Sequence, residues 1–198
     1  MQAATANPSV LQPSAPQTAP PRKARSMSLA EFRRKYEGRE DGFKYEFNRG
    51  QVEKSTRNTN AKHAHIIRNL NRRFAQTAAY VAGGELIPEM DQLTGFDQQR
   101  RPDFSFWSES KIKNADESVS EFVIEIISPT DRHEDIVLKR REYFRAGVKV
   151  AWYLSPAERT VSVYLSPTQV TVCEGDTLCS AAPVVPDFQM KAEDVFRL

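Results

Sequence analysis

The stretch Phe122-Val-Ile-Glu-Ile-Ile127 decides the fold, because it is apolar at every position except Glu125. A continuous apolar run of this length is typical of a strand that is covered on both faces. A helical pattern follows over 133–146 and ends at Gly147, a helix C-cap, and Val148-Lys-Val-Ala-Trp-Tyr-Leu154 is a second strand candidate. Strand, helix and strand in this order predict a crossover connection between parallel strands. The expected fold class is therefore α/β, with a mixed β-sheet core flanked by helices.

Further elements are expected on both sides of this unit. Ser28 and Glu31 have the spacing of a capping box, which predicts a short helix to about Lys35. The longest helix is predicted over 61–79, where apolar side chains recur at helical spacing. The remaining predicted strands are 44–47 and 50–55, which form a hairpin around Asn48-Arg49, and then 85–93, 102–107, 160–165 and 168–173.

Composition divides the chain into a tail and one domain. Residues 1–27 are rich in Pro and Ala and poor in large apolar side chains, which predicts a disordered tail before an ordered domain at 28–198. The whole excess of Lys and Arg (28) over Asp and Glu (26) comes from Arg22, Lys23 and Arg25 in the tail, so bulk charge does not indicate nucleic-acid binding. The sequence has no apolar run of membrane-spanning length and no secretory signal pattern, and we expect a cytoplasmic protein.

Two acidic residues stand at unusual places in the predicted strands. Glu125 lies within the apolar strand, where an unpaired carboxylate would cost several kcal/mol. Asp103 follows Pro102 at the start of a short strand. Side by side, the two carboxylates would suit Mg²⁺ or Mn²⁺, which prefer oxygen ligands. A structural ion pair for Glu125 and a polar strand start for Asp103 are the alternatives.

The helix after Glu125 carries Asp135 and Lys139 one turn apart. This spacing is also that of an ordinary surface ion pair. Lys139 lies at the edge of the core-facing side, however, and from there it could reach back over the end of the strand. A lysine in that place could stabilise the charge that develops on a phosphate.

These residues resemble a known family, the Uma-type restriction endonucleases within the PD-(D/E)XK nuclease superfamily. The resemblance covers roughly residues 28–198, and its pieces are fairly specific in their order and spacing. They are Tyr45-Glu-Phe-Asn-Arg-Gly-Gln-Val52, His63, Arg101-Pro-Asp103, Glu125-Ile-Ile-Ser-Pro129, Asp135 with Lys139, Tyr143, Ala146-Gly-Val148, Trp152-Tyr-Leu154 and Pro186-Asp-Phe188. The resemblance implies a restriction-endonuclease-like fold.

The resemblance also implies roles for individual residues. Asp103 and Glu125 match the two metal-ligating acids of the superfamily, and Glu46 matches an early acid near the metal. The superfamily's lysine normally lies two residues after the second acid, where this chain has Ile127. In the Uma-type pattern the lysine is displaced to the following helix, and Lys139 matches it. His63 matches a helix histidine, although a hydrogen-bonded histidine in a half-buried cleft is an equally good interpretation.

The expected function is that of a metal-dependent endodeoxyribonuclease, with Mg²⁺ or Mn²⁺ held by Asp103 and Glu125 and with Lys139 assisting the attack of water on phosphorus. DNA is the expected partner, and a homodimer is a possible assembly. On the helix at 61–79, His65, Arg68 and Arg72 form one polar ridge, and these three residues and Arg73 could contact phosphates. The alternatives are a nuclease-fold module that binds nucleic acid or a protein without cleavage, and a purely structural fold.

The predicted tail gives the first test. Limited proteolysis should cut the chain near Arg22–Arg25 and leave a folded core, because a segment without burial is the preferred site of proteolytic nicking. Circular dichroism and thermal melting of the truncated product would check this. Loss of cooperative melting on truncation would show that the tail is part of the fold.

Overall fold

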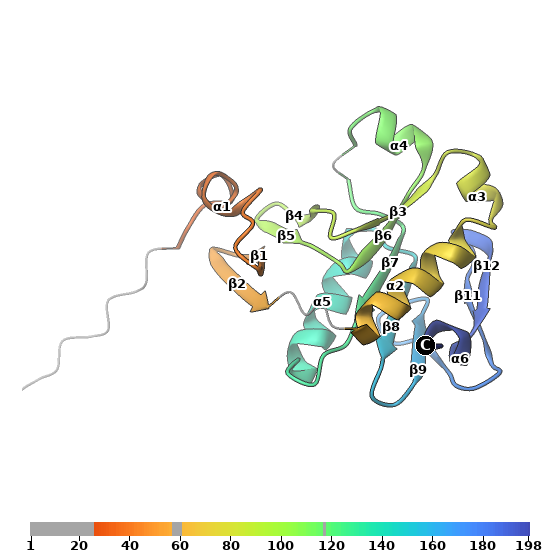
Figure 1. Ribbon diagram of the computed structural model, residues 1–198. Coiled ribbons are helices and arrows are strands. Elements are labelled where there is room, and N and C mark those ends of the chain that lie inside the picture. The colour runs from red at the N-terminus through yellow and green to blue at the C-terminus, as the bar shows by residue number, and fades with distance from the viewer. Residues whose placement is uncertain (1–25, 57–60, 117) are drawn as a thin grey trace, which may run out of the picture.

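The computed structural model describes residues 26–56, 61–116 and 118–198. Its central element is a six-stranded sheet with the strand order β10-β9-β8-β7-β6-β3. Figure 1 labels β3, β6, β7, β8 and β9 of this sheet. Strands β7 and β8 run parallel, and the other neighbours in this sheet are antiparallel. In chain order the strands are β3 (Glu85–Pro88), β6 (Phe104–Trp107), β7 (Phe122–Ile126), β8 (Val150–Ser155), β9 (Thr160–Tyr164) and β10 (Val170–Cys173). The predicted mixed sheet with a parallel pair is thereby confirmed.

Helix α5 (His133–Ala146) connects the two parallel strands and covers one face of this sheet. It ends at Gly147, whose φ of 118° is the left-handed conformation that glycine adopts most easily. Tyr143 of α5 is fully buried and packs with Val123 of β7 and Tyr153 of β8. The predicted crossover is confirmed, and α5 begins and ends at the predicted residues, 133 and 146.

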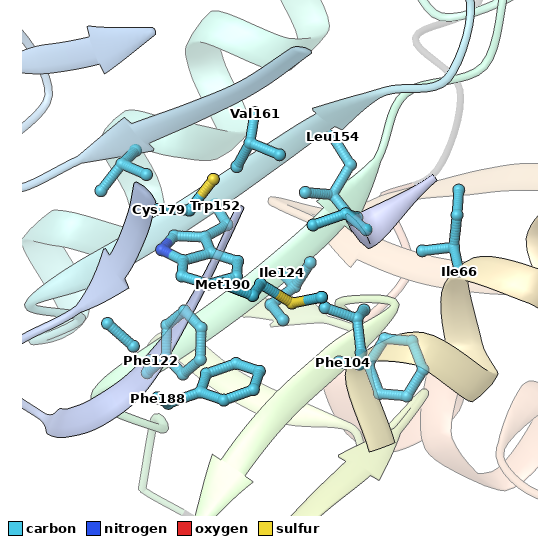
Figure 2. Packing of buried hydrophobic residues seen from close by; sticks show 14 of the residues in the cluster. Ile66, Phe104, Phe122, Ile124, Trp152, Leu154, Val161, Cys179, Phe188 and Met190 are labelled. Carbon is cyan, nitrogen blue, oxygen red and sulfur yellow. The ribbon is translucent and has the colours of Figure 1, made fainter. Parts of the chain in front are cut away.

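The opposite face of the sheet is covered by α2 (Ala61–Phe74), by the hairpin of β11 (Leu178–Ala181) and β12 (Val185–Lys191), and by α6 (Ala192–Val195). The α2 residues Ile66, Leu70 and Phe74 are buried here, in the same cluster as Ile124 and Leu154. Figure 2 shows how Phe188 of β12 lies against the strands: its ring stacks on Trp152 with centroids 5.2 Å apart. The main hydrophobic core is thus formed between the sheet and the C-terminal hairpin.

A second sheet has the order β2-β1-β5-β4 and lies beside α5 (Figure 1). Its strands are β1 (Phe43–Asn48), β2 (Gln51–Thr56), β4 (Gln92–Gly95) and β5 (Gln98–Arg100). The side chains of β1 alternate: Phe43, Tyr45 and Phe47 pack against α1 (Leu29–Tyr36), and Lys44 and Glu46 point to the other face. This alternation follows from the two-residue period of a strand and places two charged side chains toward α5 and β7.

Helix α1 (Leu29–Tyr36) begins with the predicted capping box, in which Ser28 accepts from the backbone N–H of Glu31 and the Glu31 side chain accepts from the backbone N–H of Ser28. Met27 packs against the same cluster as α1. Apart from Ser26 and Met27, the tail predicted at 1–27 lies outside the described residues.

The helix predicted over 61–79 is wrong at its C-terminal end. Helix α2 stops at Phe74, and a separate short helix, α3 (Ala78–Val81), follows. Thr77 causes the break, because its hydroxyl donates to the carbonyl of Phe74 (2.7 Å) and accepts from the N–H of Tyr80 (3.2 Å). Thr77 is therefore the N-cap of a new helix, α3, although the helical pattern of the sequence continues through it.

The strand predicted over 85–93 is also wrong in its second half. Strand β3 ends at Pro88, and Glu89 has a φ of 48°, so the chain leaves the main sheet there and enters β4 of the second sheet. The first hairpin turns at Arg49-Gly50 rather than at Asn48-Arg49. The strands β5, β11 and β12 and the short helices α4 (Glu109–Lys113) and α6 were not predicted.

The stacking of Phe188 on Trp152 generates a stability prediction. Phe188→Ala should lower the free energy of unfolding by about 3–5 kcal/mol, because a fully buried ring is removed from a packed core. Urea denaturation measures the change. Phe96→Ala is the matched control: Phe96 is fully exposed in the turn between β4 and β5 and its removal should leave the stability nearly unchanged. Equal effects of the two substitutions would contradict the packing described.

Candidate active site

Asp103 and Glu125 lie opposite each other on neighbouring strands of the main sheet. Asp103 immediately precedes β6, and the pairing of Phe104 with Ile124 places it opposite Glu125. Because Phe104 and Ile124 point into the core beneath α2, their neighbours Asp103 and Glu125 point to the face that α5 covers. Asp103 Oδ2 also accepts from the backbone N–H of Ile126 at 2.6 Å. The backbone of β7 thus fixes one oxygen of this carboxylate.

Strand β1 adds a lysine and a third acid to this pair. The Lys44 ammonium donates to Asp103 Oδ1 at 2.9 Å and lies 4.0 Å from Glu125 Oε2. Glu46, two residues further on the same face of β1, accepts from the backbone N–H of Arg101 at 2.6 Å. Both β1 side chains are buried, with 8% of each residue exposed. The second sheet therefore closes over the acids of the first.

Helix α5 supplies the remaining groups. The Lys139 ammonium lies between Glu46 Oε1 (3.0 Å) and Glu125 Oε1 (2.9 Å). The hydroxyl of Tyr143, one turn along α5, donates to the same Glu125 oxygen at 2.6 Å. Asp135 is exposed near the start of the helix. Lys139 therefore bonds to two acids of the site and not, as the surface-pair alternative required, to Asp135.

A buried ion pair fastens the second sheet to α5 next to these acids. Arg100 of β5 is 2% exposed and donates to Glu142 of α5, with an Nη2–Oε2 distance of 2.6 Å. It also pairs with Glu53 of β2 and lies 3.7 Å from Glu46. Gln98 donates to the other Glu142 oxygen at 2.8 Å. This network holds β1 in the position from which Lys44 and Glu46 reach the acids on β6 and β7.

The environment pushes the pKa values of the two central acids apart. For Asp103, burial opposes ionisation, but the Lys44 ammonium and the N–H of Ile126 outweigh it and lower the pKa of this carboxyl. For Glu125, burial prevails over the attraction of Lys139 and Lys44, and the negative charge of Asp103 adds to it, so its pKa is raised. Such divergence between neighbouring carboxyls is common in functional sites.

The third acid and the two lysines are held in their charged forms. Burial of Glu46 is outweighed by the charges of Lys139, Lys44 and Arg100, which lower its pKa to about 2. Burial tends to deprotonate Lys139, yet Glu125 and Glu46 raise its pKa above the ordinary value. The pKa of Lys44 is raised in the same way, chiefly by Asp103. Both lysines are therefore cations at neutral pH.

The donor set fits a divalent cation by its chemistry. Carboxylate oxygens are the ligands that Mg²⁺ and Mn²⁺ prefer. Three carboxylates (Glu46, Asp103 and Glu125) face two ammonium groups (Lys44 and Lys139), which leaves a net negative charge. In the part of the chain that the structure describes, however, no three His, Cys, Asp or Glu side chains gather around one point as metal ligands would. The carboxylates converge on the ammonium groups instead.

Two of the residues predicted on α2, Arg68 and Arg73, bond to the C-terminal segment and not to these acids. Arg73 donates to the backbone carbonyls of Gln189 (2.5 Å) and Asp187 (2.9 Å), and Arg68 to that of Arg197 (3.3 Å), so both bind the C-terminal segment. The partly buried His63 and His65 and the exposed Arg72 lie on the same helix. Helix α2 packs through Ile66, Leu70 and Phe74 on the face of the main sheet opposite to α5. Phosphate binding by His65, Arg68, Arg72 and Arg73 remains a prediction.

Sequence reasoning missed Lys44, the contact of Tyr143 with Glu125, and Arg100. A signal for Lys44 was present in Phe43-Lys-Tyr-Glu-Phe47, where aromatic and charged residues alternate. Such alternation in a strand predicts that both charges share one face. The partner of that face could not be inferred, since β1 and β7 are far apart in the sequence and belong to different sheets.

The arrangement of sheet and helices is shared with a solved structure. It matches the crystal structure of a protein described as "a putative nuclease belonging to DUF820" from Anabaena variabilis, with a TM-score of 0.69, 21% sequence identity, and coverage of 86% of this chain and 97% of that one. Residues 29–193 match the Uma2 family, described as "putative restriction endonuclease", and the chain belongs to this family. The family resemblance and the fold class expected from the sequence are confirmed.

Two negative findings complete the comparison. Among curated proteins, none matches this sequence. In residues 26–56, 61–116 and 118–198, no helix is both long and apolar enough to cross a membrane.

The depressed pKa of Glu46 predicts a pH-dependent contribution to stability. Because its pKa is about 2 in the folded protein and about 4.5 ordinarily, the stabilisation is complete above pH 4.5 and is lost as the pH falls toward 2. Without added metal, Glu46→Gln should destabilise the protein by on the order of 3 kcal/mol at pH 7, and by progressively less below pH 4.5.

Urea denaturation of the wild type and the variant from pH 7 to pH 3 checks this difference. The control is Glu121→Gln, which removes an acid whose side chain is 45% exposed and paired with Lys149 on the surface. A gap between wild type and Glu46→Gln that stays constant as the pH falls would argue against charged pairing of Glu46.

Proposed function

We propose that this protein is a metal-dependent endodeoxyribonuclease that hydrolyses phosphodiester bonds of DNA. The observation that carries the proposal is the meeting of Glu46, Asp103 and Glu125 with Lys139 at the end of β7. Membership of a family described as "putative restriction endonuclease" supports DNA as the substrate. The homodimer and the cytoplasmic location expected from the sequence remain predictions.

Asp103 and Glu125, with Glu46 beside them, would hold Mg²⁺ or Mn²⁺. A divalent ion in such a site lowers the pKa of water and stabilises negative charge on phosphate oxygens. Hydrogen bonds within the protein orient these carboxylates without a bound ion. The N–H of Ile126 orients Asp103, and the hydroxyl of Tyr143 orients Glu125. Neither carboxylate has to be reoriented from solvent when the substrate binds, which is the advantage of a preorganised site.

Lys139 would act as a fixed positive charge. Its raised pKa keeps the ammonium protonated at neutral pH, so it is suited to stabilise developing charge on the phosphate and unsuited to remove a proton from water. Its side chain is partly exposed (16%), in contrast to the 9% of Glu125.

A second candidate is a nuclease-fold module that binds nucleic acid or a protein without cutting. One observation favours it: Ile127 occupies the superfamily's usual lysine position, and its side chain packs against the core on the α5 face. The pairing of the acids with lysines also gives them a structural role. Cleavage activity separates the two candidates.

The decisive test is cleavage of supercoiled plasmid DNA in Mg²⁺ or Mn²⁺. The wild type should nick or linearise the plasmid, Glu125→Ala should be inactive, and Lys139→Met should be slower on the order of 10²-fold. Lys149→Met is the matched control, since Lys149 pairs with Glu121 on the surface and should not affect the rate.

Thermal melting must accompany these rates. Because Lys139 neutralises two buried acids, Lys139→Met should also melt at a lower temperature when no metal is added. Rates are therefore compared at a temperature where every variant is folded. Wild-type protein that is folded, binds DNA and leaves it uncut in both metals would favour the non-cutting module.

A further inference from the structure

Lys44 and Lys139 face different oxygens of the Glu125 carboxylate. Lys139 and the hydroxyl of Tyr143 share Oε1 of Glu125. The other oxygen of that carboxylate, Oε2, faces the Lys44 ammonium at 4.0 Å. The same ammonium donates to Asp103 Oδ1 at 2.9 Å. Lys44 thus lies between the two central acids, and Lys139 lies to one side of them.

We propose that Lys44 is an internal competitor of the divalent cation: it neutralises Asp103 and Glu125 while no ion is bound, and the ion binds when the Lys44 ammonium leaves them. This inference rests on the proposed function, because it assumes that these two acids hold a metal. It explains why three carboxylates lie close together in the described residues without forming a ready metal site.

Electrostatics supports the exchange. Unpaired, the partly buried Asp103 and the buried Glu125 would repel each other, and Lys44 removes this cost in the folded protein. A cation bound to the same two carboxylates would share both partners with the ammonium, and two cations so close in a poorly solvated site repel strongly. Without the Lys44 charge, the three carboxylates would be opposed chiefly by Lys139, since Arg100, 3.7 Å from Glu46, is paired with Glu53 and Glu142. The net charge of the three carboxylates and Lys139 would then match one divalent ion.

The structure of the side chain makes the exchange feasible. A lysine has a flexible four-carbon stem, so its ammonium can move without a change in the backbone of β1. Lys139 lacks this freedom to leave, because Glu46 and Glu125 hold its ammonium from two sides at 3.0 and 2.9 Å. The geometry therefore assigns opposite behaviour to the two lysines when a metal binds.

The experiment is a calorimetric titration of Mn²⁺ into the protein without DNA. Lys44→Met keeps the length of the stem and removes the charge, and it should bind Mn²⁺ at least about tenfold more tightly than the wild type. Lys149→Met should bind as the wild type does. Lys44→Met should also melt at a lower temperature than the wild type without metal and regain more of its stability when Mn²⁺ is added.

Equal or weaker Mn²⁺ binding by Lys44→Met would overturn the inference. Mn²⁺ binding by the wild type tests the proposed function. A wild type that binds no Mn²⁺ would count against metal dependence, whereas tighter binding by Lys44→Met than by the wild type would still support competition by Lys44.

A second measurement needs no variant and remains informative if Lys44→Met does not fold. Lys44 has only 10% of its side chain exposed in the ion pair. Brief labelling of the wild type with an amine-acylating reagent, followed by peptide mass spectrometry, should show more modification of Lys44 with Mn²⁺ than without it. Lys149 serves as the internal reference. Unchanged or reduced labelling of Lys44 at saturating Mn²⁺ would overturn the inference.

Discussion

The neutralisation of three carboxylates, two of them buried and that of Asp103 partly exposed, is the constraint on which the site depends. Glu46, Asp103 and Glu125 come from β1, the start of β6, and β7, and no single element could pair them all. The cations come from β1 and α5, so the charges tie the second sheet, the main sheet and the crossover helix to one another. Breaking one of these pairs would leave a charge that the low-polarity surroundings do not solvate, which costs several kcal/mol.

The part of the site that the sequence predicts is the part encoded by local patterns. An acid inside an apolar strand identifies Glu125, and strand, helix and strand in order place α5 over it. Asp103 is brought to Glu125 because β6 and β7 are neighbours in the sheet. The roles of these residues as ligands and of Lys139 as a catalytic group go beyond position, and they are proposals that rest on chemistry.

The part that the sequence does not predict is set by contacts between distant segments. In the sequence, Arg100 is simply one of two adjacent basic residues. Its burial is explained by its ion pair with Glu142, which lies 42 residues later on α5. The hairpin of β11 and β12 lies over β8 because Phe188 stacks on Trp152, a pairing that no local periodicity encodes. Helix α2 and strand β3 end although the apolar spacing continues beyond them. The cap formed by Thr77 ends the first and the left-handed backbone of Glu89 ends the second, and such local effects do not change the apolar pattern.

The spacing of Lys139, Glu142 and Tyr143 on α5 has an evolutionary consequence. These positions are three and four residues apart, so all three side chains point from one side of the helix toward the acids and Arg100. Exposed positions on α5 can change freely without disturbing them. An insertion or deletion of one residue between Lys139 and Tyr143 would instead rotate one of them away by about 100°, a turn that follows from 3.6 residues per helical turn. Descendants of this chain can therefore vary the surface of α5 but not its length within this segment.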